Sequence, residues 1–138
     1  AVLELAGMRA ALMQRVRDAV EAWQTRAVSV VLFGSVARGE AGPASDIDLL
    51  VVRPDSVPAD DATWERQIEE LTESVHRWTG NPCEILEYGS SELATLVAAG
   101  DSLVDSLRTD GIAVAGAPPR SPLQEQRLLV LSLFWQVL

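Results

Sequence analysis

Two short apolar runs, separated by a stretch of small residues, constrain the fold of this chain more than any other feature. The first run spans residues 28–33 and ends at Gly34, and the second spans residues 47–52. Apolar runs of this length, bounded by glycine, serine and proline, are typical of buried strands. The intervening residues 34–45 predict a loop, or a short helix followed by a turn. The sequence therefore predicts two central strands of a sheet.

Helices and two further strands are predicted around this pair. Apolar residues at helical spacing predict a helix over residues 2–23 and another from Trp64 to Trp78. We therefore expect an α/β (α+β) domain, in which a small mixed β-sheet is flanked by helices. The remaining predicted elements are strands at 83–88 and 112–115 and short helices at 90–99 and 101–108.

The C-terminal residues 118–138 predict a separate apolar helix. Residues 121–124 supply an N-cap serine, a proline in the first turn and a glutamine as capping-box partner. Residues 128–138 are apolar nearly all round, so this segment must be buried by the chain itself or by a partner. We expect it to pack on the preceding domain or to mediate association.

Charge and cysteine content exclude several functional classes. A formal net charge of -9 argues against general nucleic-acid binding, because affinity for the phosphate backbone comes from clustered Lys and Arg. The one cysteine, Cys83, cannot form an internal disulfide or a cysteine-based zinc site. No apolar run approaches the roughly 20 residues that span a bilayer. We expect a cytoplasmic protein that acts without a membrane.

A pair of aspartates lies where the second apolar run begins. Asp46 and Asp48 are two residues apart, so on a strand their carboxylates share one face, about 6.6 Å apart along the backbone. Hard oxygen ligands of this kind favour Mg²⁺, and a site for two magnesium ions would require a third carboxylate. Glu84 is our candidate for this third acid and Glu87 is the alternative. The two cannot easily serve together, because residues three apart on a strand face opposite sides of the sheet.

The Gly34–Ser35 pair at the end of the first run is a candidate phosphate-binding turn. Glycine allows the backbone to approach a ligand closely, and the N–H groups here, with the Ser35 hydroxyl, could hold triphosphate oxygens. Arg38 could lie near the same phosphates, although a surface or loop-stabilising role is the more common one for such an arginine. The sequence alone leaves both roles of Arg38 open.

Gly34–Ser35, Gly39 and the run Ser45-Asp46-Ile47-Asp48-Leu49 together resemble the signature of the polymerase β-type nucleotidyltransferase superfamily. The small size resembles its minimal nucleotidyltransferase (MNT) branch. The resemblance implies a nucleotidyltransferase domain over residues 1–117, with its catalytic core at 27–116.

The resemblance also implies roles for individual residues. In that family the aspartates matching Asp46 and Asp48 bind both metal ions, and the serine matching Ser35 contacts the triphosphate. Ser45 belongs to the same signature and is expected at the nucleotide site. Many members have Asp where Glu84 stands, and this glutamate is the expected third acid.

By resemblance, the expected reaction is transfer of AMP from ATP to a hydroxyl group. Minimal members are often antitoxins that modify a tyrosine of a HEPN ribonuclease toxin, and this is the partner and acceptor that we expect. One alternative is modification of an aminoglycoside or another small molecule, because a cationic acceptor would suit an acidic chain. Another is a nucleotide-sensing regulatory module within a longer DNA-binding regulator, since the chain begins at Ala1 inside a helical pattern.

Overall fold

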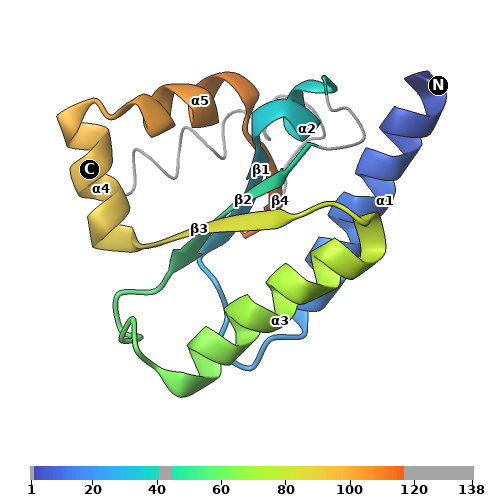
Figure 1. Cartoon of the computed structure of the whole chain (residues 1–138). Coiled ribbons are helices and arrows are strands. Elements are labelled where there is room, and N and C mark those ends of the chain that lie inside the picture. Colours follow the sequence, from blue (N-terminus) through green and yellow to red (C-terminus); the bar gives the residue numbers. More distant parts are fainter. Residues whose placement is uncertain (1, 41–44, 117–138) are drawn as a thin grey trace.

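A four-stranded mixed sheet forms the centre of the molecule (Figure 1). The computed structural model describes residues 2–40 and 45–116, so the helix predicted at 118–138 lies outside the described residues. The strand order is β3-β2-β1-β4, with β1 antiparallel to β2 and β4, and β2 parallel to β3. The predicted mixed sheet flanked by helices is confirmed. Its strands are β1 (Ser29–Phe33), β2 (Ile47–Arg53), β3 (Cys83–Gly89) and β4 (Ile112–Ala115).

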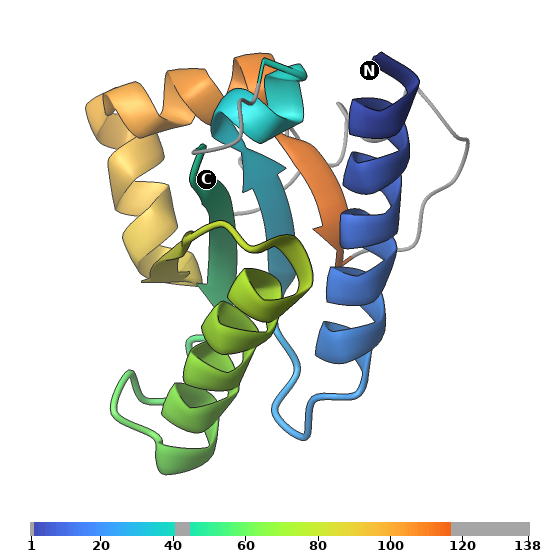
Figure 2. The ribbon, with the colours of Figure 1, turned by 45° about the vertical axis from the view of Figure 1, so that its right-hand side comes forward.

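Two long helices cover one face of this sheet (Figure 2). They are α1 (Val2–Glu21) and α3 (Ala62–Thr79). Helix α1 ends two residues before its predicted end, and Trp23, just beyond it, packs edge-to-face against the buried Trp64. The core on this side includes Leu12, Val16 and Val20 of α1, Val30 and Leu32 of β1, Ile47, Leu49 and Val51 of β2, and Trp64, Leu71 and Val75 of α3.

Two shorter helices, α4 (Ser90–Ala99) and α5 (Ser102–Asp110), cover the opposite face. Side chains alternate between the two faces of a strand, so every second residue of β2 faces these helices. The position of Asp48 in this alternation places it on the α4 and α5 side. The buried core here consists of Val31, Phe33, Leu50, Val52, Leu93, Val104 and Leu107.

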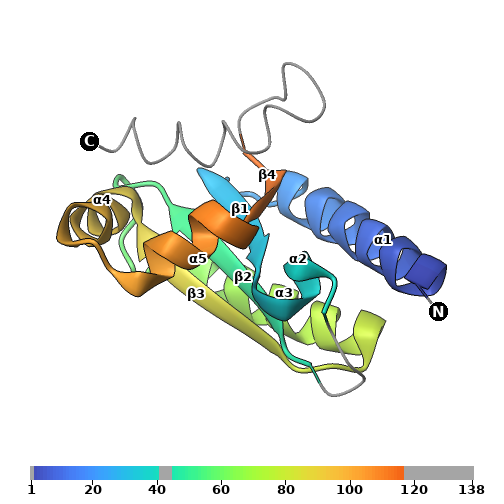
Figure 3. The same ribbon diagram turned by 90° about the horizontal axis from the view of Figure 1, so that it is seen from above.

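The segment after β1 forms a short helix, α2 (Gly34–Arg38), which is one of the two predicted outcomes. The helix stops at Gly39, whose φ of 75° is the left-handed conformation that favours glycine. Arg9 of α1 donates a hydrogen bond of 2.9 Å to the carbonyl of Ala37, which satisfies one of the last carbonyl groups of α2. Figure 3 shows α2 at the end of the sheet where β1 stops. The short helix is therefore held at the sheet end that carries the candidate site.

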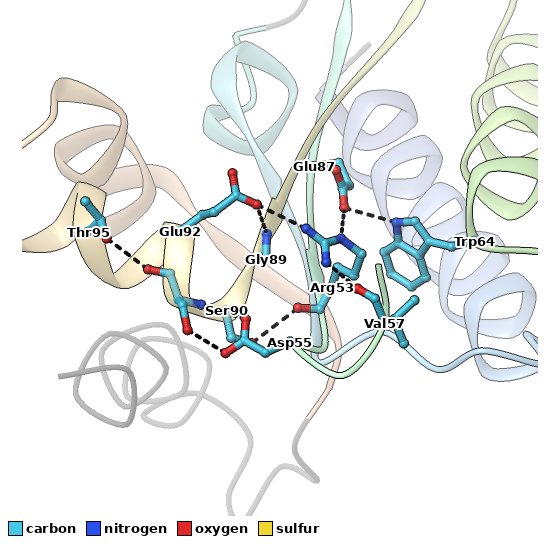
Figure 4. Close-up of polar contacts among 10 residues, drawn as sticks. Arg53, Asp55, Val57, Trp64, Glu87, Gly89, Ser90, Glu92 and Thr95 are labelled. Carbon is cyan, nitrogen blue, oxygen red and sulfur yellow. Dashed lines mark hydrogen bonds and ion pairs between the residues drawn. The ribbon is translucent and has the colours of Figure 1, made fainter. Parts of the chain in front are cut away.

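An arginine-centred network fixes the other end of β2 (Figure 4). Arg53 is 7% exposed; its Nε lies 2.7 Å from Glu87 Oε1, its Nη2 lies 3.1 Å from Glu92 Oε1, and its Nη1 donates to the Val57 carbonyl. The indole of Trp64 donates a 3.0 Å hydrogen bond to the same Glu87 oxygen. A guanidinium this buried requires such partners, because an unpaired buried charge is strongly destabilising.

No helix within residues 2–40 and 45–116 is long and apolar enough to cross a bilayer.

Candidate active site

Gly34 brings the start of α2 into contact with Asp48 on the neighbouring strand. Gly34 follows Phe33, the last residue of β1, and Phe33 is the register partner of Asp48. The φ of Gly34 is 76°, and a Cβ at this position would overlap Asp48 Oδ2 and lie 3.2 Å from Asp48 Cγ. Only glycine therefore fits here without displacing the carboxylate, as the sequence reasoning expected of a close backbone approach.

The structure places Glu84 beside Asp48 on the adjacent strand. Asp48 of β2 and Glu84 of β3 are register partners in a parallel pairing, so their side chains share a face of the sheet. Asp46 is exposed and lies two residues before Asp48, where β2 has not yet begun. The three predicted acids therefore gather at one end of the sheet.

Charge and burial act together on Asp48. Its pKa is raised above the ordinary value, first by burial and then by the negative charges of Glu84 and Asp46. The positive charge of Arg38 acts in the opposite direction and lowers this pKa. Two neighbouring carboxylates that raise the pKa of a third form a site where a bound cation would relieve repulsion.

Glu87, the alternative third acid, lies on the opposite face of the sheet. It is the register partner of Val51, which belongs to the core beneath α1 and α3. Its carboxylate accepts from Arg53 at 2.7 Å and from the Trp64 indole at 3.0 Å. Glu87 thus has a structural role on the face of the sheet opposite Asp48, and Glu84 remains the proposed third acid.

Arg38 lies at the C-terminal end of α2 and forms two ion pairs. Its Nε lies 2.9 Å from Glu40 Oε2, and its Nη1 lies 3.1 Å from Asp110 Oδ2 at the end of α5. Both contacts hold the pKa of Arg38 above its ordinary value, the hydrogen bond to Glu40 contributing most. These ion pairs agree with a loop-stabilising role for Arg38. Its positive charge also lowers the pKa of Asp48, so a role in binding the phosphates is compatible with its position.

Sequence reasoning did not single out Asp110. It lies 72 residues from Arg38, and no motif or periodicity relates the two positions. The local signal, an aspartate before Gly111 at the end of a helix, marks a turn and nothing more.

The two predicted serines, Ser35 and Ser45, both precede the predicted acids in the sequence. Ser35 is the second residue of α2 and is half-buried, next to Gly34. Ser45 is also half-buried and precedes Asp46 at the point where the described chain resumes. Their roles in nucleotide binding remain predictions.

The carboxylates fit a divalent cation in chemistry, although they are not closed into a cage. Across residues 2–40 and 45–116, no three His, Cys, Asp or Glu side chains are arranged so that they could already hold a metal ion. The donors near Asp48 are nevertheless hard carboxylate oxygens, which suit Mg²⁺, and their mutual repulsion favours a cation between them. A metal site here requires the exposed Asp46 and Glu84 side chains to close on Asp48.

Comparison with known proteins places the chain in a family. The sequence profile of the nucleotidyltransferase domain matches residues 13–93, which is more than half of the chain. The chain belongs to the nucleotidyltransferase domain family. The matched part of this nucleotidyltransferase runs from within α1 to the start of α4 and includes Gly34, Asp46, Asp48 and Glu84. No curated protein sequence gives a significant match.

Solved structures with the same fold include chains of toxin–antitoxin complexes. A toxin–antitoxin crystal structure with AMP-PNP aligns with a TM-score of 0.55 at 17% identity, covering 90% of this nucleotidyltransferase and 85% of that chain. A mutant MntA–HpeT toxin–antitoxin complex gives 0.55 at 15% identity, covering 90% and 85%. The tri-AMPylated Shewanella oneidensis HEPN toxin with its MNT antitoxin gives 0.50 at 14% identity, covering 94% and 88%. At these identities the likeness shows a shared fold.

Proposed function

We propose that this nucleotidyltransferase transfers AMP from ATP to a hydroxyl group in a magnesium-dependent reaction. The observation that carries the proposal is the arrangement at one end of the sheet. Asp48 and Glu84 share a face on adjacent strands, Asp46 lies two residues away, and Gly34 brings the start of α2 against the Asp48 carboxylate. Family membership supports nucleotidyl transfer as the reaction class.

Each residue has a task in this reaction. Asp46 and Asp48 would hold the metal, which supplies positive charge to the triphosphate and to the oxygen that attacks it. The N–H groups of Gly34 and Ser35, together with the Ser35 hydroxyl, would donate hydrogen bonds to triphosphate oxygens. Ser45, next to Asp46, would border the same nucleotide site.

The chemical step would be an in-line displacement at the α-phosphorus. The acceptor oxygen forms a bond to the α-phosphorus of ATP, and the bond to the bridging oxygen breaks to release pyrophosphate. Glu84 would take the proton from the acceptor hydroxyl or complete the metal site. Positioning and charge stabilisation supply most of the rate in this class of reaction, so small displacements of the acids should be costly.

The acceptor that we propose is a tyrosine of a HEPN-type toxin, which would make this chain a cytoplasmic antitoxin. The support is the shared fold with chains of toxin–antitoxin complexes, one of which is described as an AMPylated HEPN toxin with its MNT antitoxin. A net charge of -9 would also suit a cationic small molecule such as an aminoglycoside. The reaction test below separates these acceptors from a nucleotide-sensing module.

The test is magnesium-dependent incorporation of label from α-labelled ATP. The protein is incubated with a co-expressed HEPN-type toxin from the same source, with cell lysate, or with aminoglycosides, and labelled products are separated by size. Asp48→Ala is the inactive variant, and Asp60→Ala is the matched control, because Asp60 is an exposed aspartate in the loop before α3. A labelled toxin band that requires Mg²⁺ and Asp48 supports the proposal.

Other outcomes assign the function differently. Label on an aminoglycoside alone would make the chain a small-molecule nucleotidyltransferase. ATP binding without transfer to any acceptor would favour the regulatory module. Labelling that persists in Asp48→Ala would show that the acids at this sheet end do not carry the reaction.

A further inference from the structure

An ion pair links α2, which borders the proposed nucleotide site, to α5, a helix that carries no predicted site residue. Arg38, the last residue of α2, contacts Asp110, the last residue of α5, with 3.1 Å between Nη1 and Oδ2. The Asp110 side chain is 13% exposed, whereas that of Glu40, the other partner of Arg38, is 66% exposed. Asp110 is thus the better shielded of the two carboxylates.

The end of α5 is held firmly over the sheet. Val104 and Leu107 of α5 are 2% and 1% exposed and belong to the core beneath α4 and α5. Gly111 donates a 2.9 Å hydrogen bond to the Leu107 carbonyl, and a Cβ at Gly111 would overlap that carbonyl oxygen. This tight exit from α5 leads straight into β4, so the position of Asp110 is fixed by buried neighbours.

Strand pairing explains why these two residues meet. Strand β4 runs antiparallel to β1, and Ile112 near its start pairs with Leu32 near the end of β1. Residues just before β4 and residues just after β1 therefore lie at the same end of the sheet. Asp110 and Arg38 occupy those two positions, and Arg38 belongs to the short helix whose first residue, Gly34, lies against Asp48.

The contacts of Arg38 leave it able to bind an anion. A guanidinium has five N–H donors in a rigid planar fork, and the bonds to Glu40 and Asp110 engage Nε and Nη1. A guanidinium that a carboxylate already holds on one side can offer its remaining N–H donors to phosphate oxygens. Binding then costs less side-chain entropy, because the rotamer is already fixed. Glu40 is mostly exposed, so we expect it alone to hold the guanidinium less firmly than Asp110 does.

We propose that Asp110 is a positioning residue, which holds the Arg38 guanidinium in place to receive the triphosphate of the nucleotide. This inference rests on the proposed function, because it assumes that the triphosphate lies between α2 and the acids. Asp110 does not touch the nucleotide in this account and acts only through Arg38. Its loss should weaken binding of ligands that carry the triphosphate and spare ligands that lack it.

The test compares binding of Mg·ATP and of AMP to the full chain by calorimetry. We expect Asp110→Asn to raise the Kd for Mg·ATP by about tenfold and to leave the Kd for AMP unchanged within about twofold. Asp110→Glu keeps the carboxylate and should recover most of the affinity. Asp105→Asn is the matched control, because Asp105 is an exposed aspartate in the first turn of the same helix. Circular dichroism of each variant checks that it is folded.

A double-mutant cycle separates positioning from a general effect on the fold. Once Arg38→Ala has removed the guanidinium, adding Asp110→Asn should cause no further loss of Mg·ATP affinity. Additive losses, or equal weakening of Mg·ATP and AMP, would overturn the inference and leave the ion pair as a link between α2 and α5. If the wild-type chain binds no Mg·ATP, the proposed function fails first, and this inference fails with it.

Discussion

The carboxylate of Asp48 occupies the space that a side chain at position 34 would need. A Cβ built on Gly34 would overlap Asp48 Oδ2, and the φ of Gly34 is 76°. Gly34→Ala must therefore displace the carboxylate and also adopt a strained backbone conformation, which costs about 1–2 kcal/mol for a residue with a side chain. We expect adenylyl transfer to fall about 100-fold or more, measured as the initial rate of label incorporation.

Gly80→Ala provides the matched control for this substitution. Gly80 has a φ of 74°, but a Cβ there would meet nothing within 4 Å. Gly80→Ala should lose about 1–2 kcal/mol of unfolding free energy from backbone strain, measured by urea denaturation, and keep its activity. Gly34→Ala should lose at least as much stability and also lose activity. Equal activity of the two variants would show that the contact between Gly34 and Asp48 does not matter for the reaction.

The raised pKa of Asp48 predicts how stability depends on pH and metal. A carboxyl whose pKa is higher in the folded state stabilises that state below its unfolded pKa, and this contribution is lost as the pH rises through the folded pKa. The ordinary value is 3.8, and burial followed by the charges of Glu84 and Asp46 raises it. In EDTA at pH 7 we therefore expect Asp48→Asn to unfold at a higher temperature than the wild type.

Thermal unfolding at two pH values and with Mg²⁺ tests this account. Near pH 3 the carboxyl is largely protonated in both states, so the advantage of Asp48→Asn should shrink. Mg²⁺ should raise the melting temperature of the wild type and have little effect on the variant. An Asp48→Asn variant that is less stable than the wild type in EDTA at pH 7 would contradict the charge repulsion described here.

Two glutamates three positions apart should respond in opposite ways to the same substitution. Glu84 lies beside Asp48, whereas Glu87 binds Arg53 and the Trp64 indole on the other face. Glu84→Gln should reduce transfer by about 100-fold or more with little change in stability. Glu87→Gln should cost about 1–3 kcal/mol, because it weakens a hydrogen-bonded pair with a buried arginine, and should retain transfer.

Paired assays of activity and urea denaturation on the two variants decide between these roles. A loss of activity in Glu87→Gln that exceeds its loss of folded protein would return Glu87 to the list of candidate acids. Normal transfer by Glu84→Gln would remove Glu84 from the proposed mechanism.

Cys83 should be unreactive in the folded protein. Burial, with a smaller effect from the charge of Asp48, raises the pKa of its thiol to about 12. Thiolate is the reactive form, so near pH 8 we expect alkylation by iodoacetamide at least about 100-fold slower than in the urea-unfolded chain. Mass spectrometry of timed samples gives the rate. Equal rates for folded and unfolded protein would show that this end of β3 is open to solvent.

Much of the fold could be predicted because it is encoded over short distances. The apolar runs that became β1 and β2 and the helical spacing that became α3 lie within stretches of a few to about twenty residues. The ends of the helices were harder to predict, because tertiary packing decides where a helix stops. Helix α1 stops at Glu21 rather than at residue 23, and Trp23 turns out of the helix to pack on Trp64.

By itself the sequence determined the small mixed sheet and the close approach at Gly34, and it predicted that the carboxylates of Asp46 and Asp48 share one face. Those features depend on strand periodicity and on the backbone freedom of glycine, which are local properties. Only the tertiary structure decided that Glu84, rather than Glu87, lies beside Asp48, because strand register is set by packing between distant segments. The contact between Arg38 and Asp110 has the same origin: antiparallel pairing of β1 with β4 joins residues that no local pattern relates.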